Sequence, residues 1–312
     1  MDQTDPLLKA RSYQPPPSGY KTKEFVMCTT TIDESSTEGN IEVARDQYFV
    51  QLDFNKHDLD DRAILAINDQ ATNAWIHAAQ ILPKKDLNAV HCMSCFQCTI
   101  GWFHGQINLI WVLLHTHYRT GEQIGSLQFF ILFLGKVCLG KEKLDFNTLR
   151  SLVTQVLSGN ILTYWKSETG ISLSEFAATK PSPMQLLKHA QNIYDNWVSN
   201  TALQCAAGTP DVEGSGDEAQ QNTILLNRDF LMFFELSSAI SSGDFSRVEI
   251  LMGTITMMFA GAGCKNYTTE LLHFIQNLKH VWMAEFAYVL STTVKMIQLI
   301  TYSAMLYVIT RL

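Results

Sequence analysis

The chain has 312 residues, of which 46% are hydrophobic and 17% are charged. That hydrophobic fraction can supply a sizeable core, so the composition excludes global disorder. The formal net charge of −7 excludes binding of nucleic acid through a general excess of Lys and Arg, so contact with DNA would need a local basic patch or a further segment.

The cysteine content bears on the compartment of the protein. There are seven cysteines, an odd number, and the first residues contain no apolar segment of the secretory-signal type. A secreted disulfide framework normally has an even and denser set of cysteines. We therefore expect an intracellular protein in a reducing compartment.

The first part of the chain predicts little regular structure. Residues 1–22 contain three consecutive prolines, Pro15 to Pro17, which block helix and ladder hydrogen bonds, so we expect a flexible lead-in. A mixed and then helical domain is expected over 23–207. Within it, 25–32 (FVMCTTTI) is a β-prone run and the acidic stretch 53–61 indicates a solvated loop.

A short apolar run, residues 63–67 (AILAI), ends abruptly at Asn68-Asp69-Gln70. Its length suits a buried strand, although its periodicity also allows a helical turn. We expect Asp69 at the carboxyl end of this strand, with its two neighbours in the following turn. Thr72 is the predicted N-cap of a helix that ends near residue 82.

Helices are expected to dominate the rest of the chain, because apolar residues recur there at helical spacing. The run 127–134 is apolar all round, which indicates a buried helix. Residues 208–222 are rich in glycine and acid without an apolar face, so they are the predicted linker to a C-terminal helical segment, 223–312. The predicted helices include 107–114, 127–134, 184–197, 226–240 and 248–259, with a helix–helix turn at Ser242-Gly243-Asp244.

The last apolar segment, residues 286–310, has one charge, Lys295. Its length could span a bilayer, but a charge in the middle of a span is costly and polar residues share the segment. We prefer a terminal helix that packs against the protein core, and membrane anchoring through 286–310 stays as the alternative.

Three blocks of sequence together resemble one family. They are residues 32–43 (IDESSTEGNIEV), then NDQAT at 68–72 with GWFHGQIN at 101–108, then 226–282 with LNRDF, AISSGDFSRVE and NYTTELLHFIQNLKHVW. The order and spacing resemble a transposon-associated domain-of-unknown-function family of mushroom-forming fungi. The resemblance covers most of residues 30–282. Members are typically longer, with an upstream Asp-Asn motif and a continuation after the third block, which implies a partial or truncated member here.

The resemblance to transposases implies a chemistry for three residues. Ribonuclease-H-like transposases use acidic side chains to hold two divalent metals, which activate a water or a DNA 3′-hydroxyl. One acid ends a strand and the last comes from a helix beyond a helical insertion. On that pattern Asp69 and Glu270 are candidate catalytic residues and ligands of Mg²⁺ or Mn²⁺, and His104 is a candidate catalytic residue. DNA would then be the partner, and the location nuclear.

Each of these residues also has a purely structural interpretation. Asp69 can be a turn residue whose carboxylate accepts hydrogen bonds from the local backbone. His104 can be a packed core histidine, and Glu270 can serve only in side-chain pairing along its helix. The first acid of the pattern stays open, because Asp33 and Asp53 are equally placed and a further segment can supply it.

A second constellation is a run of cysteines, Cys92, Cys95 and Cys98, followed by His104. Cysteine and histidine at short spacing can form a tetrahedral zinc site. Structural zinc sites usually pair two such groups across a longer gap, however, so buried thiols are the preferred interpretation and the protein should bind little zinc there.

We therefore expect a mainly α fold with a small α+β portion, which a degenerate or partial ribonuclease-H-like core interrupted by a helical insertion would explain. The leading functional hypothesis is a transposon-derived nuclease- or transposase-like protein, partial or inactive. The alternatives are a non-enzymatic helical scaffold or interaction protein, and a membrane-anchored protein.

Overall fold

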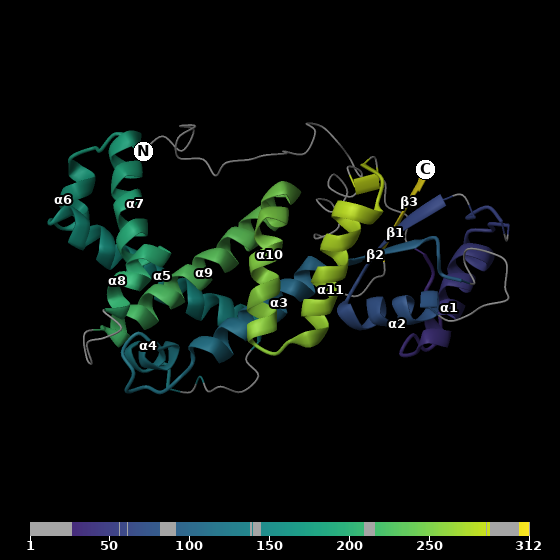
Figure 1. Cartoon of the computed structure of the whole chain (residues 1–312), viewed down its shortest axis with the longest axis horizontal. Coiled ribbons are helices and arrows are strands. Elements are labelled where there is room, and N and C mark those ends of the chain that lie inside the picture. The colour runs from purple at the N-terminus through teal and green to yellow at the C-terminus, as the bar shows by residue number, and fades with distance from the viewer. Residues whose placement is uncertain are drawn as a thin grey trace. The chain divides into compact units, whose positions relative to one another are not determined.

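The computed structural model describes residues 27–55, 57–60, 62–81, 92–137, 139, 145–208, 216–284, 286–287 and 306–311. The predicted lead-in, 1–22, lies outside the described residues, as does much of the predicted terminal helix. Figure 1 shows the whole chain with its elements labelled.

The described chain is mainly helical, as the sequence predicts, with a small sheet. Most helices begin at a Ser or Asp whose side chain accepts a hydrogen bond from the first turn, as Ser172, Ser182 and Ser199 do. The α-helices are α1 (Thr37–Arg45), α2 (Gln70–Ile81), α3 (Trp102–His117), α4 (Leu127–Phe133), α5 (Phe146–Thr169), α6 (Leu173–Ala178), α7 (Pro183–Trp197), α8 (Asn200–Ala207), α9 (Glu218–Ser242), α10 (Phe245–Gly261) and α11 (Lys265–Gln276). Two π-helical segments are η2 (Asp46–Gln51) and η3 (Asn277–Val281).

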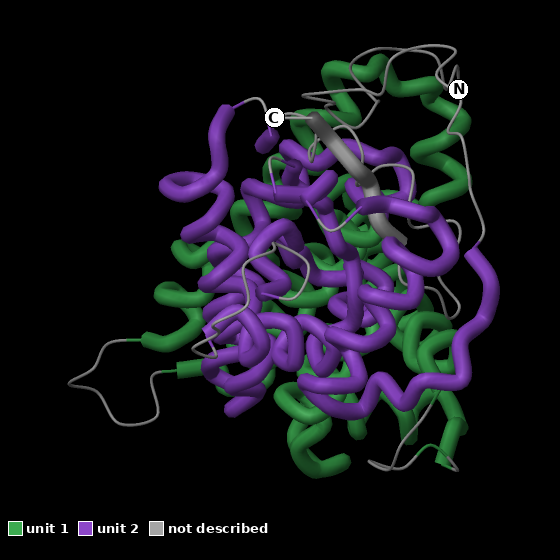
Figure 2. The backbone as a smooth tube through the Cα atoms, turned by 90° about the vertical axis from the view of Figure 1, so that its right-hand side faces the viewer, with its two compact units in different colours: residues 1–12, 107–237 green, residues 13–106, 238–312 purple. Residues whose placement is uncertain are grey.

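The chain divides into two compact units, which Figure 2 shows in different colours. Unit 1 contains residues 107–237, and unit 2 contains the described parts of 13–106 and 238–312. Unit 2 is thus built from two stretches of chain that unit 1 interrupts.

The sheet belongs to unit 2 and has the strand order β2-β1-β3. β1 (Arg62–Asn68) pairs in parallel with β2 (Phe96–Ile100), and α2 lies between them in the chain. β3 (Leu306–Arg311) pairs with β1 on its other side, antiparallel. The central strand β1 reads RAILAIN, and its residues from Ala63 to Asn68 are all buried, because a central strand covered on both faces needs apolar side chains on both.

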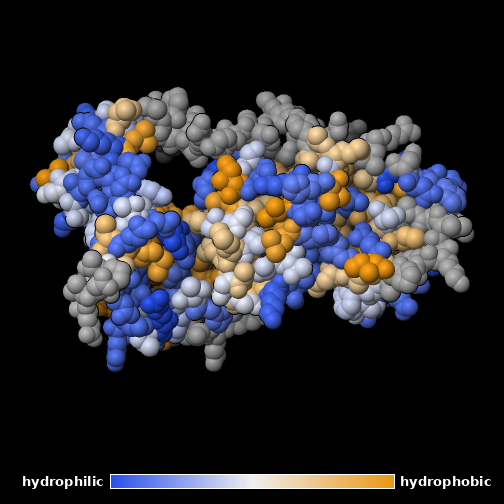
Figure 3. All heavy atoms as spheres, in the orientation of Figure 1, coloured by the Kyte–Doolittle hydropathy of each residue, from blue (hydrophilic) through white to orange (hydrophobic). Residues whose placement is uncertain are grey.

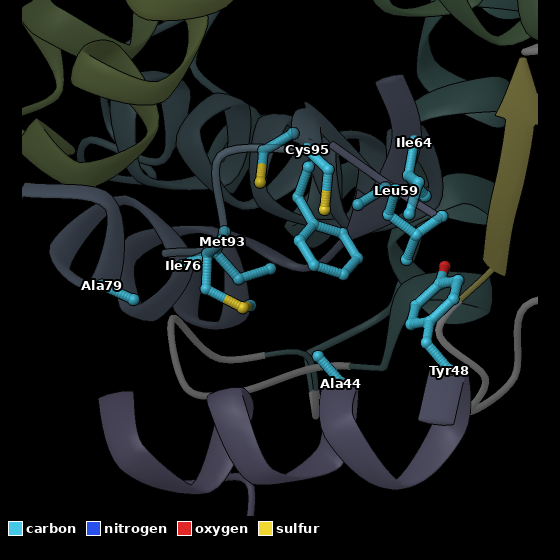
Figure 4. Packing of buried hydrophobic residues seen from close by; sticks show 11 residues of the cluster. Ala44, Tyr48, Leu59, Ile64, Ile76, Ala79, Met93 and Cys95 are labelled. Carbon is cyan, nitrogen blue, oxygen red and sulfur yellow. The ribbon is translucent and has the colours of Figure 1, made fainter. Parts of the chain in front are cut away.

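The core of unit 2 lies where α1, η2 and α2 cover this sheet. Figure 4 shows Ile76 of α2, Tyr48 of η2, the strand residue Ile64 and the turn residue Cys95 in one buried cluster. Tyr48 also meets the Phe96 ring edge to face at 5.6 Å between centroids, a geometry that aromatic pairs favour. The sheet is therefore held rigidly by apolar packing.

Unit 1 has a helical core with polar residues inside it. The rings of Tyr164 on α5 and Trp197 on α7 stack at 4.4 Å. Asn227 on α9 donates to the Tyr164 hydroxyl at 2.9 Å, and His117 lies 2.9 Å from Asp229, also on α9. Because buried polar groups cost free energy unless they are paired, these contacts fix the register of α9 against its neighbours.

Several predicted elements are wrong in detail. Residues 27–34 form no strand and belong to no part of the sheet β2-β1-β3. α9 begins at Glu218, inside the predicted linker, since Asp217 caps it through the backbone N–H of Gln220. α4 was expected to be buried, but Phe133 is 78% exposed and only Leu127 and Ile131 are buried.

The terminal segment also differs from the prediction. Residues 306–311 form strand β3, so a continuous helix over 286–310 is wrong at its end: the main chain there pairs with the open edge of β1. The stretch 288–305 lies outside the described residues. Among the residues that the structure describes, no helix has both the length and the apolar character needed to cross a membrane.

The face drawn in Figure 3 carries hydrophobic groups interspersed with hydrophilic ones. On α10, for example, Ile250 is 63% exposed and Met257 is 67% exposed. Single exposed apolar side chains of this kind are normal on folded proteins and indicate no site by themselves.

Candidate functional site

The carboxyl ends of β1 and β2 meet at one edge of the sheet. Asn68, the last residue of β1, lies opposite Ile100, the last residue of β2. The N–H of Gly101 then donates to the Asn68 carbonyl at 2.7 Å. A Cβ atom at position 101 would lie 3.0 Å from that carbonyl oxygen, so this close approach favours glycine. Ligands of open α/β sheets bind at such an edge.

Asp69 lies at this edge, directly after β1, as predicted. The neighbouring residues do not form the expected turn, because Asn68 still belongs to the strand and Gln70 begins α2. The Asp69 carboxylate accepts a hydrogen bond from the N–H of Thr72 at 2.8 Å. Asp69, and not Thr72, therefore caps α2.

Glu270 lies on α11, on the helix where the sequence placed it, and its side chain is only 6% exposed. Its carboxylate accepts a 2.7 Å hydrogen bond from the side-chain amide of Asn73 on α2. Its other oxygen lies 3.8 Å from Nε2 of His77, also on α2. The helix that Asp69 caps is thus the helix that holds Glu270, and Figure 1 shows α2 and α11 beside the sheet.

Asn73 is a residue of the candidate site that sequence reasoning missed. It is fully buried and its amide also donates to the Thr99 carbonyl on β2 at 2.9 Å. Its carbonyl oxygen accepts from the Asn68 amide at 3.0 Å. The signal was present, since Asn73 precedes Ile76 and Ala79 on the buried face of α2, where a polar residue needs partners.

His77 and His273 form a pair of imidazoles beside Glu270. Nε2 of His77 lies 3.2 Å from Nδ1 of His273 on α11, and the ring planes are 82° apart. Burial acts to lower the pKa of His77, but the Glu270 carboxylate and the hydrogen bond with Gln80 together outweigh it, so the pKa is raised. Burial and the charge of His77 lower the pKa of His273.

His104 lies in the first turn of α3, because this helix begins at Trp102, earlier than the predicted start at residue 107. It is exposed, so the interpretation as a packed core histidine is wrong. The helix turns its side chain outward next to the Phe103 ring, with centroids 5.8 Å apart. His104 follows Gly101 by three residues, and Gly101 lies at the strand edge where Asp69 also lies. His104 therefore belongs to the same strand edge as Asp69.

The cysteines of the second constellation, Cys92, Cys95 and Cys98, are thiols that form no disulfide. Cys95 and Cys98 are buried, and burial raises the pKa of Cys95 to about 12. Burial first, and then the charge of Glu270, raise the pKa of Cys98. Such thiols stay protonated, which disfavours the thiolate form that binds metal. Within the part of the chain that the structure describes, no group of three or more His, Cys, Asp or Glu side chains is arranged to hold a metal ion.

Comparison with known proteins gives a family but no activity. No curated protein matches the chain, and no solved structure matches it. One family model, described as a family of unknown function, matches residues 1–294. That match spans the strand edge, α2 and α11, and so includes the whole candidate site. The chain therefore belongs to the family of unknown function DUF6589.

Proposed function

We propose that unit 2 is a partial ribonuclease-H-like core of a transposon-derived, nuclease- or transposase-like protein of fungal origin. The supporting observation is the joining of Asp69 and Glu270 through one helix. Asp69 follows a central strand and caps α2, and Glu270 is hydrogen-bonded to Asn73 on the same helix.

The order of the elements supports the same proposal. A buried strand, a helix and a second parallel strand are followed by a long helical insertion, unit 1, before the helix that carries Glu270. This is the arrangement that the transposase pattern requires for its second and last acids. His104 adds a polar side chain after the second strand.

The donor chemistry at this place fits a hard cation. Mg²⁺ and Mn²⁺ prefer oxygen ligands, and Mg²⁺ is commonly held by one or two carboxylates while water and phosphate fill its other positions. Asp69 and Glu270 would supply those two carboxylates. A cation there would compete with His77 for the charge of Glu270, because His77 lies 3.8 Å away from the same carboxylate.

When bound, the cation would stabilise charge on a transferring phosphoryl group. A full two-metal site needs a third acid, and the described residues offer no group of three. We therefore propose that this chain binds the cation weakly and lacks cleavage activity by itself, with DNA as the partner of the complete assembly.

Thermal melts with Mn²⁺ test this proposal. A ligand present at ten times its dissociation constant, and bound only by the folded state, adds about 1.4 kcal/mol of stability. That corresponds to a rise in melting temperature of about 2 °C for a chain of this size. Asp69→Asn and Glu270→Gln should each abolish the rise, whereas Glu122→Gln, at an exposed position in unit 1, should keep it.

The alternative function is a non-enzymatic scaffold, which the hydrogen bonds of Asp69 and Glu270 favour because both carboxylates already serve the fold. It predicts no effect of Mn²⁺ on any of the four proteins. A wild-type melting temperature that does not move with Mn²⁺ would therefore replace the nuclease-like proposal by the scaffold.

A further inference from the structure

We propose that His77 and His273 together bind one divalent transition-metal ion of the borderline class, for which Zn²⁺ is the probe. The pair lies on α2 and α11, and neither histidine belongs to the pattern that identified Asp69 and Glu270. The proposal does not rest on the nuclease-like function, because Asp69 has no part in it.

The distance between the two nitrogens suits one shared ion. Zinc–nitrogen bonds are about 2.0–2.1 Å long, so two imidazoles on a tetrahedral ion have their nitrogens about 3.3–3.4 Å apart. Nε2 of His77 and Nδ1 of His273 are 3.2 Å apart. A metal can therefore enter with a shift of a few tenths of an ångström in either side chain.

The tautomer of His77 is set by its neighbour Gln80. The side-chain NH₂ of Gln80 donates to two backbone carbonyls, of Met93 at 3.0 Å and of Phe96 at 2.9 Å. Both of its hydrogens are thereby used, so the carbonyl oxygen of Gln80 is the atom that faces Nδ1 of His77, at 3.4 Å. Nδ1 must then carry the hydrogen, which leaves the lone pair of Nε2 directed at His273 in neutral His77.

This is the arrangement that metal-binding histidines have in proteins. The ring nitrogen that does not bind the metal normally donates to an oxygen acceptor, which fixes the ring and the tautomer. Gln80 has that role for His77, and its own position is fixed by the backbone at the start of β2.

The negative charge beside the two histidines and their exposure to solvent also favour the binding of a cation. The Glu270 carboxylate lies 3.8 Å from Nε2 of His77 and is almost fully buried, so a positive ion at the pair would offset a buried negative charge. The His77 side chain is 21% exposed and His273 is exposed. An ion can thus reach the pair from solvent, and water can fill its remaining positions, as in zinc sites that keep an open position.

Zinc titration of the purified protein by calorimetry tests the proposal. We expect one zinc per chain. Gln80→Ala removes a side chain that only orients His77, so it should weaken zinc binding by about tenfold. His77→Ala and His273→Gln each remove a metal ligand, so each should weaken zinc binding by more than about tenfold. Three controls should keep the wild-type affinity: His115→Ala on α3, the double variant Cys92→Ser with Cys95→Ser, and Asp69→Asn.

The outcomes are distinguishable. His273 is exposed, so His273→Gln should melt like the wild type without zinc, and its loss of zinc binding would then report the site and not the fold. Absence of zinc binding by the wild type would overturn the proposal, since the 3.2 Å contact would then be a hydrogen bond alone. Zinc binding that survives both histidine variants but fails in the cysteine variant would overturn it in favour of the cysteines.

Discussion

The side-chain amide of Asn73 on α2 donates a 2.7 Å hydrogen bond to the carboxylate of Glu270 on α11, although 197 positions of sequence separate them. The same amide donates to Thr99 on β2. One buried side chain therefore ties together the two stretches of chain that form unit 2.

Replacement of Asn73 should destabilise unit 2 strongly. Asn73→Ala leaves the buried carboxylate of Glu270 without its main donor, and an unsatisfied buried group costs about 1–3 kcal/mol, more when it is charged. Asn73→Asp should cost more than Asn73→Ala, because it adds a second carboxylate against Glu270. Urea unfolding followed by circular dichroism measures both. Asn147→Ala, at an exposed position, is the matched control, and equal stability of all the proteins would show that the contact contributes nothing.

Asp69 should act as a helix cap even without any metal. Asp69→Ala removes the acceptor for the Thr72 N–H and should lower the free energy of unfolding by about 1 kcal/mol. Asp69→Asn keeps an acceptor oxygen and should stay close to the wild type. Melts in the presence of a chelator measure this. If Asp69→Asn loses as much stability as Asp69→Ala, the charge and not the cap is what matters.

The buried pair of His117 and Asp229 should be a main stabilising contact of unit 1. Asp229 also accepts from the side chain of the adjacent Arg228 at 3.1 Å. Asp229→Ala leaves the buried His117 side chain without its acceptor, and an unsatisfied buried polar group costs about 1–3 kcal/mol. Hydrogen exchange of α9 amides should accelerate in this variant, while Glu122→Gln leaves it unchanged. Unchanged exchange in Asp229→Ala would mean that apolar packing alone holds α9.

The cap of α5 should make stability depend on pH in acid. Hydrogen bonds from the side chain and then the backbone of Thr148 lower the pKa of Asp145. A lowered folded-state pKa gives stability that is present above the unfolded value, about 3.9, and is lost as pH falls through the folded value. The stability difference between wild type and Asp145→Asn should therefore shrink below about pH 4. Urea unfolding at pH 3 and pH 6 compares them, and a difference that grows in acid would contradict this assignment.

The sequence by itself determined the elements whose signal is local. The run AILAI predicted β1, since its length and branched side chains suit a buried strand, and helical spacing predicted α7 and α10. Glu270 was placed on a helix by the transposase pattern, and it does lie on a helix, α11. The signals for β1, α7 and α10 lie within single short stretches, residues 63–67, 184–197 and 248–259, so the helix and strand periods suffice to detect them.

The tertiary structure decided what depends on contacts between distant segments. The terminal apolar run looked helical from its length, yet residues 306–311 pair with β1, because an open strand edge supplies the hydrogen bonds that a helix would make internally. Likewise, no local pattern shows that Asn73 and His77 meet Glu270 and His273. That meeting follows from the packing of α2 and α11 on one sheet, in which buried polar groups had to find partners far along the chain.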